Sequence, residues 1–426
     1  MKNFVCKLLV VMCVISLLLT GCENTKYKSK DNQNSLELNY STDMQIMYLC
    51  SGGSVGVPMT KSDTGYYYIG KGISDTRMII YIDKESKKAT PLCSKPNCMH
   101  DDIEECDAYV SSSSNVAIDT ILGATGNLIQ YYEGSLYLLC AEYDKSFINY
   151  NTYILKMDLD GGNRTQITEY FDFPVSRWCL HRGYFYYVTD SSLLRIPADS
   201  LKSEPEVVYE AEFFEENSEN TFRSLYAYKN YVYFLVDEKD DQGNGEGRKT
   251  LCINLDTMEK SEIKVNENYG VINGFIGDKL MISKVIGNEK VYQITDLNGK
   301  NSEQLFTQNE ADKTSVTFDG TYYYSDNQSQ IKPDSELEQV ITVFDTELNE
   351  IDKFRLPQLD MKVYSFFAPQ DEDFFIFECF NENDEHVIVM ADKSQIGSIN
   401  GDVIEYTELC TLKWVQNNSH GIYYTE

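Results

Sequence analysis

The chain repeats one hydrophobic pattern, in which a turn residue is followed by a short strand rich in aromatic side chains. The stretch from Arg182 to Ser200, RGYFYYVTDSSLLRIPADS, contains an aromatic run after Gly183, a polar turn, an apolar run and a second turn at Asp199. Runs of Tyr, Phe and aliphatic residues bounded by Gly, Asn and Asp are typical of β-strands joined by tight turns. The stretch therefore predicts a strand pair with turns on either side.

Eight copies of this pattern follow one another along the chain. They begin at Gly65, Gly134, Gly183, Asn230, Asp278, Gly320, Glu372 and Gly421. The intervals between these residues are 69, 49, 47, 48, 42, 52 and 49. Such a period is too long for leucine-rich or ankyrin repeats and suits one four-stranded blade of a β-propeller.

The second half of each copy is an apolar strand that ends at a turn rich in Asp. These turn residues are Asp83, Asp158, Asp256, Asp296, Asp345 and Asp392. A turn carboxylate accepts hydrogen bonds from nearby backbone N–H groups, so we interpret these residues as structural. Few stretches keep a helical period of 3.6 residues beyond two turns, and none forms a convincing amphipathic helix.

The pattern predicts an all-β fold, a β-propeller of four-stranded antiparallel blades. Eight starting residues favour eight blades, the last built from Leu412 to Val415, Gly421 to Thr425 and an N-terminal strand from Met44 to Leu49. Seven blades are the alternative, if the weak copy at Asp278 is not a blade. We expect residues 44–426 to form this single domain, because a closed ring leaves no long exposed edge.

The N-terminus has the features of a bacterial lipoprotein signal peptide at residues 1–21. A short basic region precedes an apolar run from Leu8 to Leu19, which is too short to span a bilayer comfortably. Leu19-Thr20-Gly21-Cys22 resembles the lipobox, which implies that Cys22 carries a diacylglyceryl group and acyl chains such as palmitate. Residues 22–43 are polar and unpatterned, so we expect a flexible tether between the lipid and the ring.

Charge narrows the choice of partners. The chain has a net charge of −30, and removal of residues 1–21 takes away two lysines. Nucleic acid is therefore not expected as a partner. The lipid on Cys22 predicts attachment to the outer face of the bacterial cytoplasmic membrane.

Two hairpins carry a resemblance to known propellers. Met157–Thr168, which contains DLDGGNRTQIT, and Thr295–Leu305, which contains DLNGKNSEQL, are similar to hairpins of TolB-like propellers. They also resemble the low-density-lipoprotein-receptor-related-protein-like β-propeller family, which includes many Gram-positive lipoproteins. The resemblance covers roughly residues 57–426 as a repeat pattern. It implies the fold and leaves the function open.

The first interval is about 20 residues longer than the others, and the extra residues are rich in Cys. The insertion at 93–110 contains Cys93, Cys98, His100 and Cys106 in the order C-x4-C-x-H-x5-C. Three thiolates and an imidazole are favoured ligands of a structural Zn²⁺ ion. A disulfide with one spare Cys is the alternative in an oxidising compartment. The other cysteines after Cys22 lie mostly in apolar strands and are expected to be core residues.

No motif in the sequence assigns a catalytic residue. Ser54 lies in a G-x-S-x-G match, but the strand-to-helix context of an esterase is missing. His181, His386 and His420 each stand alone in the sequence. We therefore expect a non-enzymatic binding or sensing module for a protein or a glycan. A carbohydrate-active propeller enzyme, hydrolase or lyase, is one alternative, and a scaffold of a cell-envelope complex is another.

Overall fold

The computed structural model describes residues 37–49, 54–55, 59–70, 76–100, 105–111, 129–143, 150–169, 171, 177–189, 191–211, 222–238, 247–309, 315–327, 340–356, 362–369, 373–380, 386–415 and 421–425. The predicted signal peptide at 1–21, the predicted lipidation residue Cys22 and the tether up to residue 36 lie outside these ranges. Within them, no helix has the length and hydrophobicity that a membrane crossing requires.

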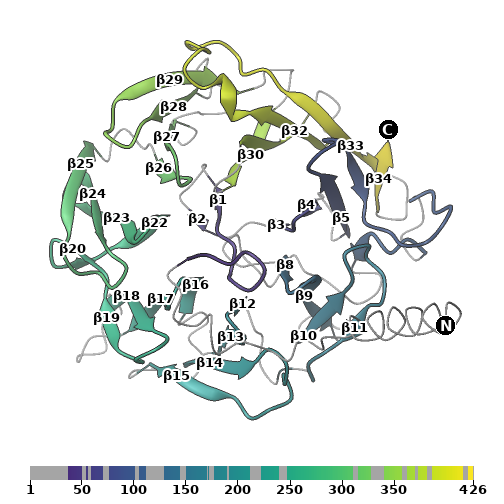
Figure 1. The fold of residues 1–426 in the computed structure, drawn as a ribbon, viewed down its shortest axis with the longest axis horizontal. Coiled ribbons are helices and arrows are strands. Elements are labelled where there is room, and N and C mark those ends of the chain that lie inside the picture. The colour runs from purple at the N-terminus through teal and green to yellow at the C-terminus, as the bar shows by residue number, and fades with distance from the viewer. Residues whose placement is uncertain are drawn as a thin grey trace, which may run out of the picture.

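The strands form a ring of seven antiparallel blades around a central axis (Figure 1). Each blade contains four consecutive strands, and the first of them lies nearest the axis. Blade 1 consists of β3 (Met59–Lys61), β4 (Gly65–Gly70), β5 (Thr76–Asp83) and β6 (Ala89–Pro91). Blade 2 consists of β8 (Ile129–Tyr132), β9 (Ser135–Tyr143), β10 (Tyr150–Met157) and β11 (Thr165–Gln166). Blade 3 consists of β12 (Trp178–His181), β13 (Tyr184–Val188), β14 (Ser192–Pro197) and β15 (Glu206–Glu210).

The other blades continue around the ring in chain order. Blade 4 consists of β16 (Phe222–Tyr228), β17 (Tyr231–Glu238), β18 (Gly247–Asn254) and β19 (Lys260–Glu262). Blade 5 consists of β22 (Val271–Ile276), β23 (Lys279–Ile286), β24 (Glu289–Asp296) and β25 (Glu303–Asn309). Blade 6 consists of β26 (Ser315–Phe318), β27 (Tyr323–Asp326), β28 (Val340–Phe344) and β29 (Glu350–Arg355). Blade 7 consists of β30 (Lys362–Pro369), β31 (Phe374–Phe380), β32 (His386–Asp392) and β33 (Thr407–Val415).

Several short elements complete the fold. A hairpin of β20 (Lys264–Val265) and β21 (Asn268–Tyr269) connects blades 4 and 5. The 3₁₀ helix η4 (Lys393–Gln395) follows β32, and its N-cap Asp392 accepts a hydrogen bond from the backbone N–H of Ser394. The strand β7 (Tyr109–Ser111) pairs with β5 beside β6.

The eighth blade favoured by the sequence does not form, and the alternative of seven is confirmed. The copy at Asp278 belongs to blade 5, and the segments expected to build a last blade join blade 7 instead. On the axis side, β1 (Met47–Leu49) pairs with β30, and β2 (Ser54–Val55) pairs with β1. On the rim side, β33 is the fourth strand of blade 7 and β34 (Gly421–Thr425) extends it.

A long connection within blade 7 explains why the repeat period near 48 residues suggested an eighth blade at Gly421. Between β32 and β33 the chain crosses to the rim of blade 6, where the carboxylate of Asp352 receives three backbone N–H groups. The donors are Gly397, Ile399 and Asn400, at 2.7, 3.0 and 2.8 Å. This detour lengthens blade 7 by enough residues that the copy at Gly421 falls one period later without starting a new blade.

The core lies between blades and not inside any one of them. One buried cluster joins blades 1, 2 and 3, a second joins blades 3, 4 and 5, and others join blades 5 and 6, 6 and 7, and 7 and 1. Because both faces of a blade are covered, consecutive residues of one strand are buried, as Tyr66, Tyr67 and Tyr68 are. This explains why the aromatic runs are continuous where a half-exposed strand would alternate.

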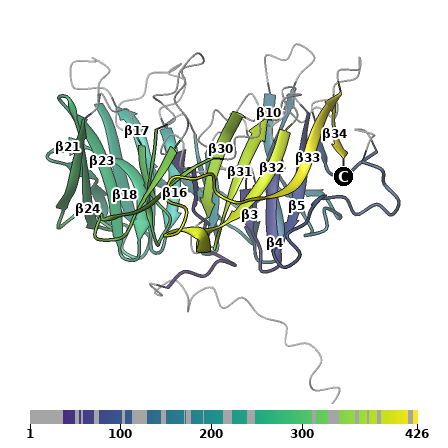
Figure 2. The ribbon, with the colours of Figure 1, turned by 90° about the horizontal axis from the view of Figure 1, so that it is seen from above.

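The N-terminal segment closes one end of the ring. Arg182 and Gly183 form the turn between β12 and β13 with positive φ at both residues, as a two-residue hairpin requires. Arg182 makes two hydrogen bonds to the carboxylate of Asp43, at 3.0 and 2.9 Å, and both side chains are buried. Its backbone N–H donates to Thr42 O, and that of Glu133 donates to Ser41 O. Figure 2 shows this early segment, in purple, at one end of the ring.

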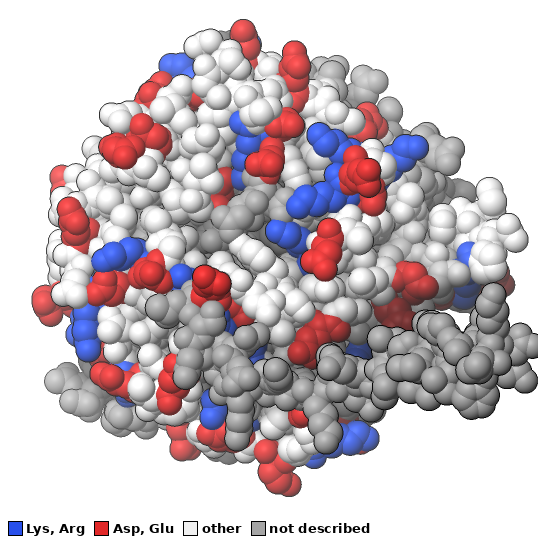
Figure 3. Space-filling model, in the orientation of Figure 1, with Lys and Arg blue, Asp and Glu red and all other residues white. Residues whose placement is uncertain are grey.

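Charged side chains are interspersed on the outer surface. On the face in Figure 3, Asp and Glu lie among Lys and Arg over the described part of the chain, and neither sign forms a continuous field. Several charged side chains of the described residues form ion pairs, as Lys202 does with Glu169 at 3.0 Å.

We expect the buried Asp43–Arg182 pair to matter far more than an exposed pair. Replacing Asp43 with Asn leaves the Arg182 charge buried without a counter-charge, which costs about 3 kcal/mol of the free energy of unfolding. Glu169→Gln removes a pair whose side chains are 72% and 81% exposed, so its cost should stay below about 1 kcal/mol. Chemical denaturation of both variants measures the difference, and equal losses would contradict the role assigned to Asp43.

Candidate metal centre

The Cys-rich insertion is a loop whose two ends are held at one residue of blade 1. The chain leaves the edge of β5 at Leu92, whose backbone N–H donates to Ile79 O at 2.9 Å. It returns at Ala108, whose carbonyl accepts from the backbone N–H of Ile79 at 2.8 Å. The strands β6 and β7 therefore act as two halves of one outer strand, and the loop between them projects from the rim.

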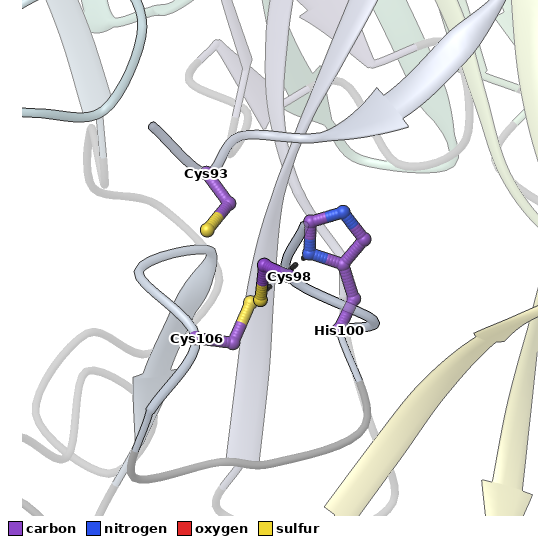
Figure 4. A group of neighbouring side chains, drawn as sticks. All are labelled: Cys93, Cys98, His100 and Cys106. Carbon is purple, nitrogen blue, oxygen red and sulfur yellow. Dashed lines mark hydrogen bonds between the residues drawn. The ribbon is translucent and has the colours of Figure 1, made fainter. Parts of the chain in front are cut away.

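The structure brings all four predicted ligands together in this loop. Figure 4 shows the thiols of Cys93, Cys98 and Cys106 and the ring of His100 turned toward a common centre. Their ligand atoms all lie within 4.8 Å of one another. The Nδ1 atom of His100 lies 3.3 Å from the Cys106 sulfur. Among the described residues, no other group of His, Cys, Asp and Glu is arranged in this way.

Two turns with positive φ shape the loop around the group. Asn97 has a φ of 63° and His100 a φ of 58°, values that are uncommon for residues other than Gly. The Cys98 N–H donates to Lys95 O, which folds the first two thiols back toward each other. The Tyr109 hydroxyl donates to His100 O at 3.0 Å and so holds the backbone that carries the imidazole.

A second set of contacts holds the loop from outside. Asp107 accepts hydrogen bonds from Ser94 at 3.2 Å and pairs with Lys95 at 3.0 Å. Arg164 of blade 2 donates to the Asp107 carbonyl and to Gly161 O. The sequence did not single out these residues. Asp107 follows a Cys without any motif, and Arg164 lies 57 residues away along the chain.

The three thiols differ in their environments. Burial raises the pKa of the Cys93 thiol, but hydrogen bonds from the backbone of Lys95 and Asp107 oppose it. Hydrogen bonds with the Cys98 and Cys106 thiols also lower the pKa of Cys93. The net result is a pKa below the ordinary value of 9.0. Burial raises the pKa of Cys106 to about 12. A bound cation would stabilise the Cys106 thiolate, which its surroundings alone disfavour.

The donor set and its spacing fit a closed tetrahedral site. Sulfur ligands at about 2.3 Å from a tetrahedral zinc ion lie about 3.8 Å apart, so the group needs only a small contraction. All three cysteines are free thiols in the structure. Four protein ligands fill such a site, which would leave no position for a substrate or a water molecule.

The group packs into the seam between the first and last blades. Cys106 is 4% exposed and belongs to a cluster that includes Ile388 and Cys410 of blade 7. Near the axis, Tyr66 contacts Phe374 edge to face, with ring centroids 5.0 Å apart. The candidate metal centre thus lies on the outer part of the contact that closes the ring.

His181, at the end of the inner strand β12, has a structural role. His181 is fully buried, and its Nδ1 accepts from the Met44 N–H at 2.9 Å while its Nε2 donates to Lys229 O at 2.7 Å. Burial lowers the pKa of His181, so the ring stays neutral in this position. The side chains of His386 and His420 lie outside the described residues.

The remaining sequence candidates also lie in structural positions. Ser54 is in β2, which pairs with β1, and the next described element is the strand β3. Cysteines expected in the core are confirmed as buried at positions Cys140, Cys179, Cys252, Cys379 and Cys410. Cys50 lies outside the described residues. Several turn carboxylates bond within their turns, as Asp83 does with the Ser86 N–H and Asp345 with the Asn349 N–H, whereas Asp256 accepts from the Asn230 side chain at 2.6 Å.

Comparisons with known proteins find similarity only to solved structures of low sequence identity. The sequence matches no protein-family model and no curated protein. Among solved structures, an oligogalacturonate lyase of Vibrio parahaemolyticus is 14% identical, with 66% of this chain and 77% of the lyase covered and a TM-score of 0.41. A puromycin-hydrolysing peptidase of Mycobacterium tuberculosis is 11% identical, with 87% and 54% covered and a TM-score of 0.49.

A further similar structure is dipeptidyl peptidase 4 of Porphyromonas gingivalis, 11% identical, with 84% of this chain and 54% of the peptidase covered and a TM-score of 0.44. The chain thus spans about half the length of the two peptidase chains. At these identities the likeness concerns the fold alone.

Proposed function

We propose that the chain is a lipid-anchored propeller on the outer face of the bacterial cytoplasmic membrane, where it binds a protein or a glycan without chemical conversion. The main support is the role of the buried polar side chains at the end of the ring that residues 37–46 close. There the buried histidine, arginine and aspartate are engaged in hydrogen bonds that hold the N-terminal segment. A propeller enzyme needs such groups to converge on a substrate.

The same segment supports a proposed orientation of the propeller on the membrane. Lipid on Cys22 would hold the tether at the membrane, and the tether would enter the ring where Asp43 contacts Arg182. The closed end of the ring then faces the bilayer, and the opposite end faces away from it. A partner would approach from that outer side. The net charge of −30 makes nucleic acid a poor candidate for the partner.

We also propose that Cys93, Cys98, His100 and Cys106 hold a structural zinc ion. The convergence of four ligand atoms within 4.8 Å supports this assignment over a disulfide with a spare thiol. The ion would cross-link a loop of about 15 residues, an effect that in a disulfide is worth about 3 kcal/mol of stability. Its position at the rim, away from the axis, supports bracing of the seam as its role.

The absence of catalysis can be tested on polysaccharides. Purified residues 22–426, incubated with polygalacturonate or with cell-wall glycan, should produce no new reducing ends and no unsaturated products. A rise that depends on the folded protein, and that a heat-unfolded sample lacks, would favour the carbohydrate-active alternative.

A protein partner can be tested by crosslinking in the native cell. Crosslinking should yield an adduct of defined mass, and recovery of monomer alone would contradict a protein partner.

The anchor can be tested by substitution of the lipidated residue. Cys22→Ala removes the thiol that takes the lipid, so the protein should move from the membrane fraction to the medium because one anchored residue supplies the membrane affinity. Cys13→Ala is the matched control and should leave the protein in the membrane fraction. Retention of the Cys22→Ala variant on the membrane would reject the lipobox.

The zinc assignment predicts one zinc ion per chain by elemental analysis of the mature protein. Cys106→Ser should lose the ion and about 3 kcal/mol of stability, by the loop-closure estimate above. Cys140→Ala, which removes a buried thiol in blade 2, should keep one zinc ion per chain. Protein without zinc, in which Cys93 and Cys98 are joined by a disulfide, would refute the assignment.

A further inference from the structure

We propose that Cys93 and Cys98 are an oxidation site, at which a hydroperoxide converts the two zinc-bound thiolates into a disulfide and releases the metal. This site rests on the zinc centre proposed above and adds a second, oxidised state to it. Zinc and disulfide are then two states of one loop instead of competing descriptions of it.

Exposure selects these two thiols from the three. Cys93 and Cys98 are half-buried, whereas Cys106 is 4% exposed within the cluster that joins blades 7 and 1. The neighbouring side chain of Met99 is 78% exposed, so this part of the loop faces solvent. An oxidant would therefore reach the first two sulfur atoms and not the third.

The loop is also built to let these two sulfur atoms meet. The turn in which the Cys98 N–H donates to Lys95 O brings the first pair of cysteines together. Their sulfur atoms lie within 4.8 Å, and a disulfide bond requires about 2.05 Å. Because Leu92 and Ala108 are both held at Ile79, the loop can tighten by this amount while its ends stay on blade 1.

The reaction balances with one hydroperoxide for each pair of thiols. The Cys93 thiolate attacks an oxygen atom of hydrogen peroxide, an S–O bond forms, the O–O bond breaks, and the leaving hydroxide takes a proton as water. The Cys98 thiolate then attacks the same sulfur, the S–S bond forms, and the second hydroxide leaves as water with a further proton. Two thiolates are oxidised by two electrons, the peroxide is reduced, and Zn²⁺ keeps its charge.

Release of the ion would weaken the packing between blades 7 and 1, where the ring closes. With the first two thiolates lost, only His100 and Cys106 remain as ligands, too few to hold a tetrahedral zinc ion. Cys106 packs with Ala108 and Tyr109 against blade 7. The oxidised loop would hold the seam less firmly, while the strand pairs of the two blades remain.

The test begins with the zinc-loaded mature protein, in which one zinc ion per chain has been measured. Hydrogen peroxide is added in equimolar steps, released zinc is followed with a chromogenic chelator, and each cysteine is assigned by differential alkylation and mass spectrometry. We expect one zinc ion released and two thiols lost per chain, with both losses at Cys93 and Cys98. Reduction with added zinc should restore the starting state. The buried thiols of Cys140, Cys179 and Cys252 are internal controls and should stay reduced.

A variant separates the two chemical steps. In Cys98→Ser the second thiolate is missing, so oxidation should stop at a sulfenic acid on Cys93, which dimedone traps. Zinc that stays bound after the Cys93 and Cys98 thiols are exposed to excess peroxide would overturn the oxidation site and leave the zinc centre intact. A disulfide to Cys106 would overturn the choice of partner. A mature protein that contains no zinc at the outset would instead overturn the zinc centre, and with it this inference.

Discussion

Every blade of this ring depends on a neighbour at each side, because both faces of its sheet carry buried side chains. Three consecutive tyrosines, Tyr66 to Tyr68, can be buried in one strand only if sheets cover both faces. Six of the seven contacts between blades join sheets that follow one another in the chain. The seventh joins blade 7 to blade 1, which are far apart in sequence, so closure of the ring is the constraint that the rest of the structure must meet.

Closure is achieved at the axis and at the rim by different means. At the axis, β1 pairs with β30 and so ties the N-terminal segment to the last blade. The same segment is held by Arg182 of blade 3 and, through Gln45, by Lys61 of blade 1. At the rim, the outer strands β6 and β7 of blade 1 have only three residues each, and the loop between them, which carries Cys106, packs against blade 7. Neither device is a shared blade, in which N- and C-terminal strands would complete one four-stranded sheet.

Much of this architecture follows from the sequence, and the part that does not has a physical reason. The period near 48 residues and the turns at Gly134 and Gly183 identify blades because they report local strand and turn geometry. The sequence favoured eight blades over the correct alternative of seven, because pairing at a sheet edge depends on long-range contacts. Nothing in Gly421–Thr425 distinguishes a strand that starts a blade from one that extends the previous blade.

The candidate metal centre also has a part that the sequence predicts and a part that it does not. The four ligands were recognisable because they lie within 14 residues and because zinc prefers thiolate and imidazole. The residues that hold the loop, such as Arg164 and Ile79, could not be found, since their role depends on which strands are neighbours. His181 was equally ambiguous, because a lone histidine becomes structural only through partners that are distant in sequence.

The positions of these groups bear on what the propeller can do. Metal chemistry in an enzyme requires an open coordination position close to a bound substrate. Here the cluster offers four protein ligands, lies at the rim and packs against a hydrophobic seam. The buried charges near the axis hold the N-terminal segment in place. Both sets of groups thus bear on the stability and closure of the ring, and the binding function proposed above would depend on the surface that the closed ring presents.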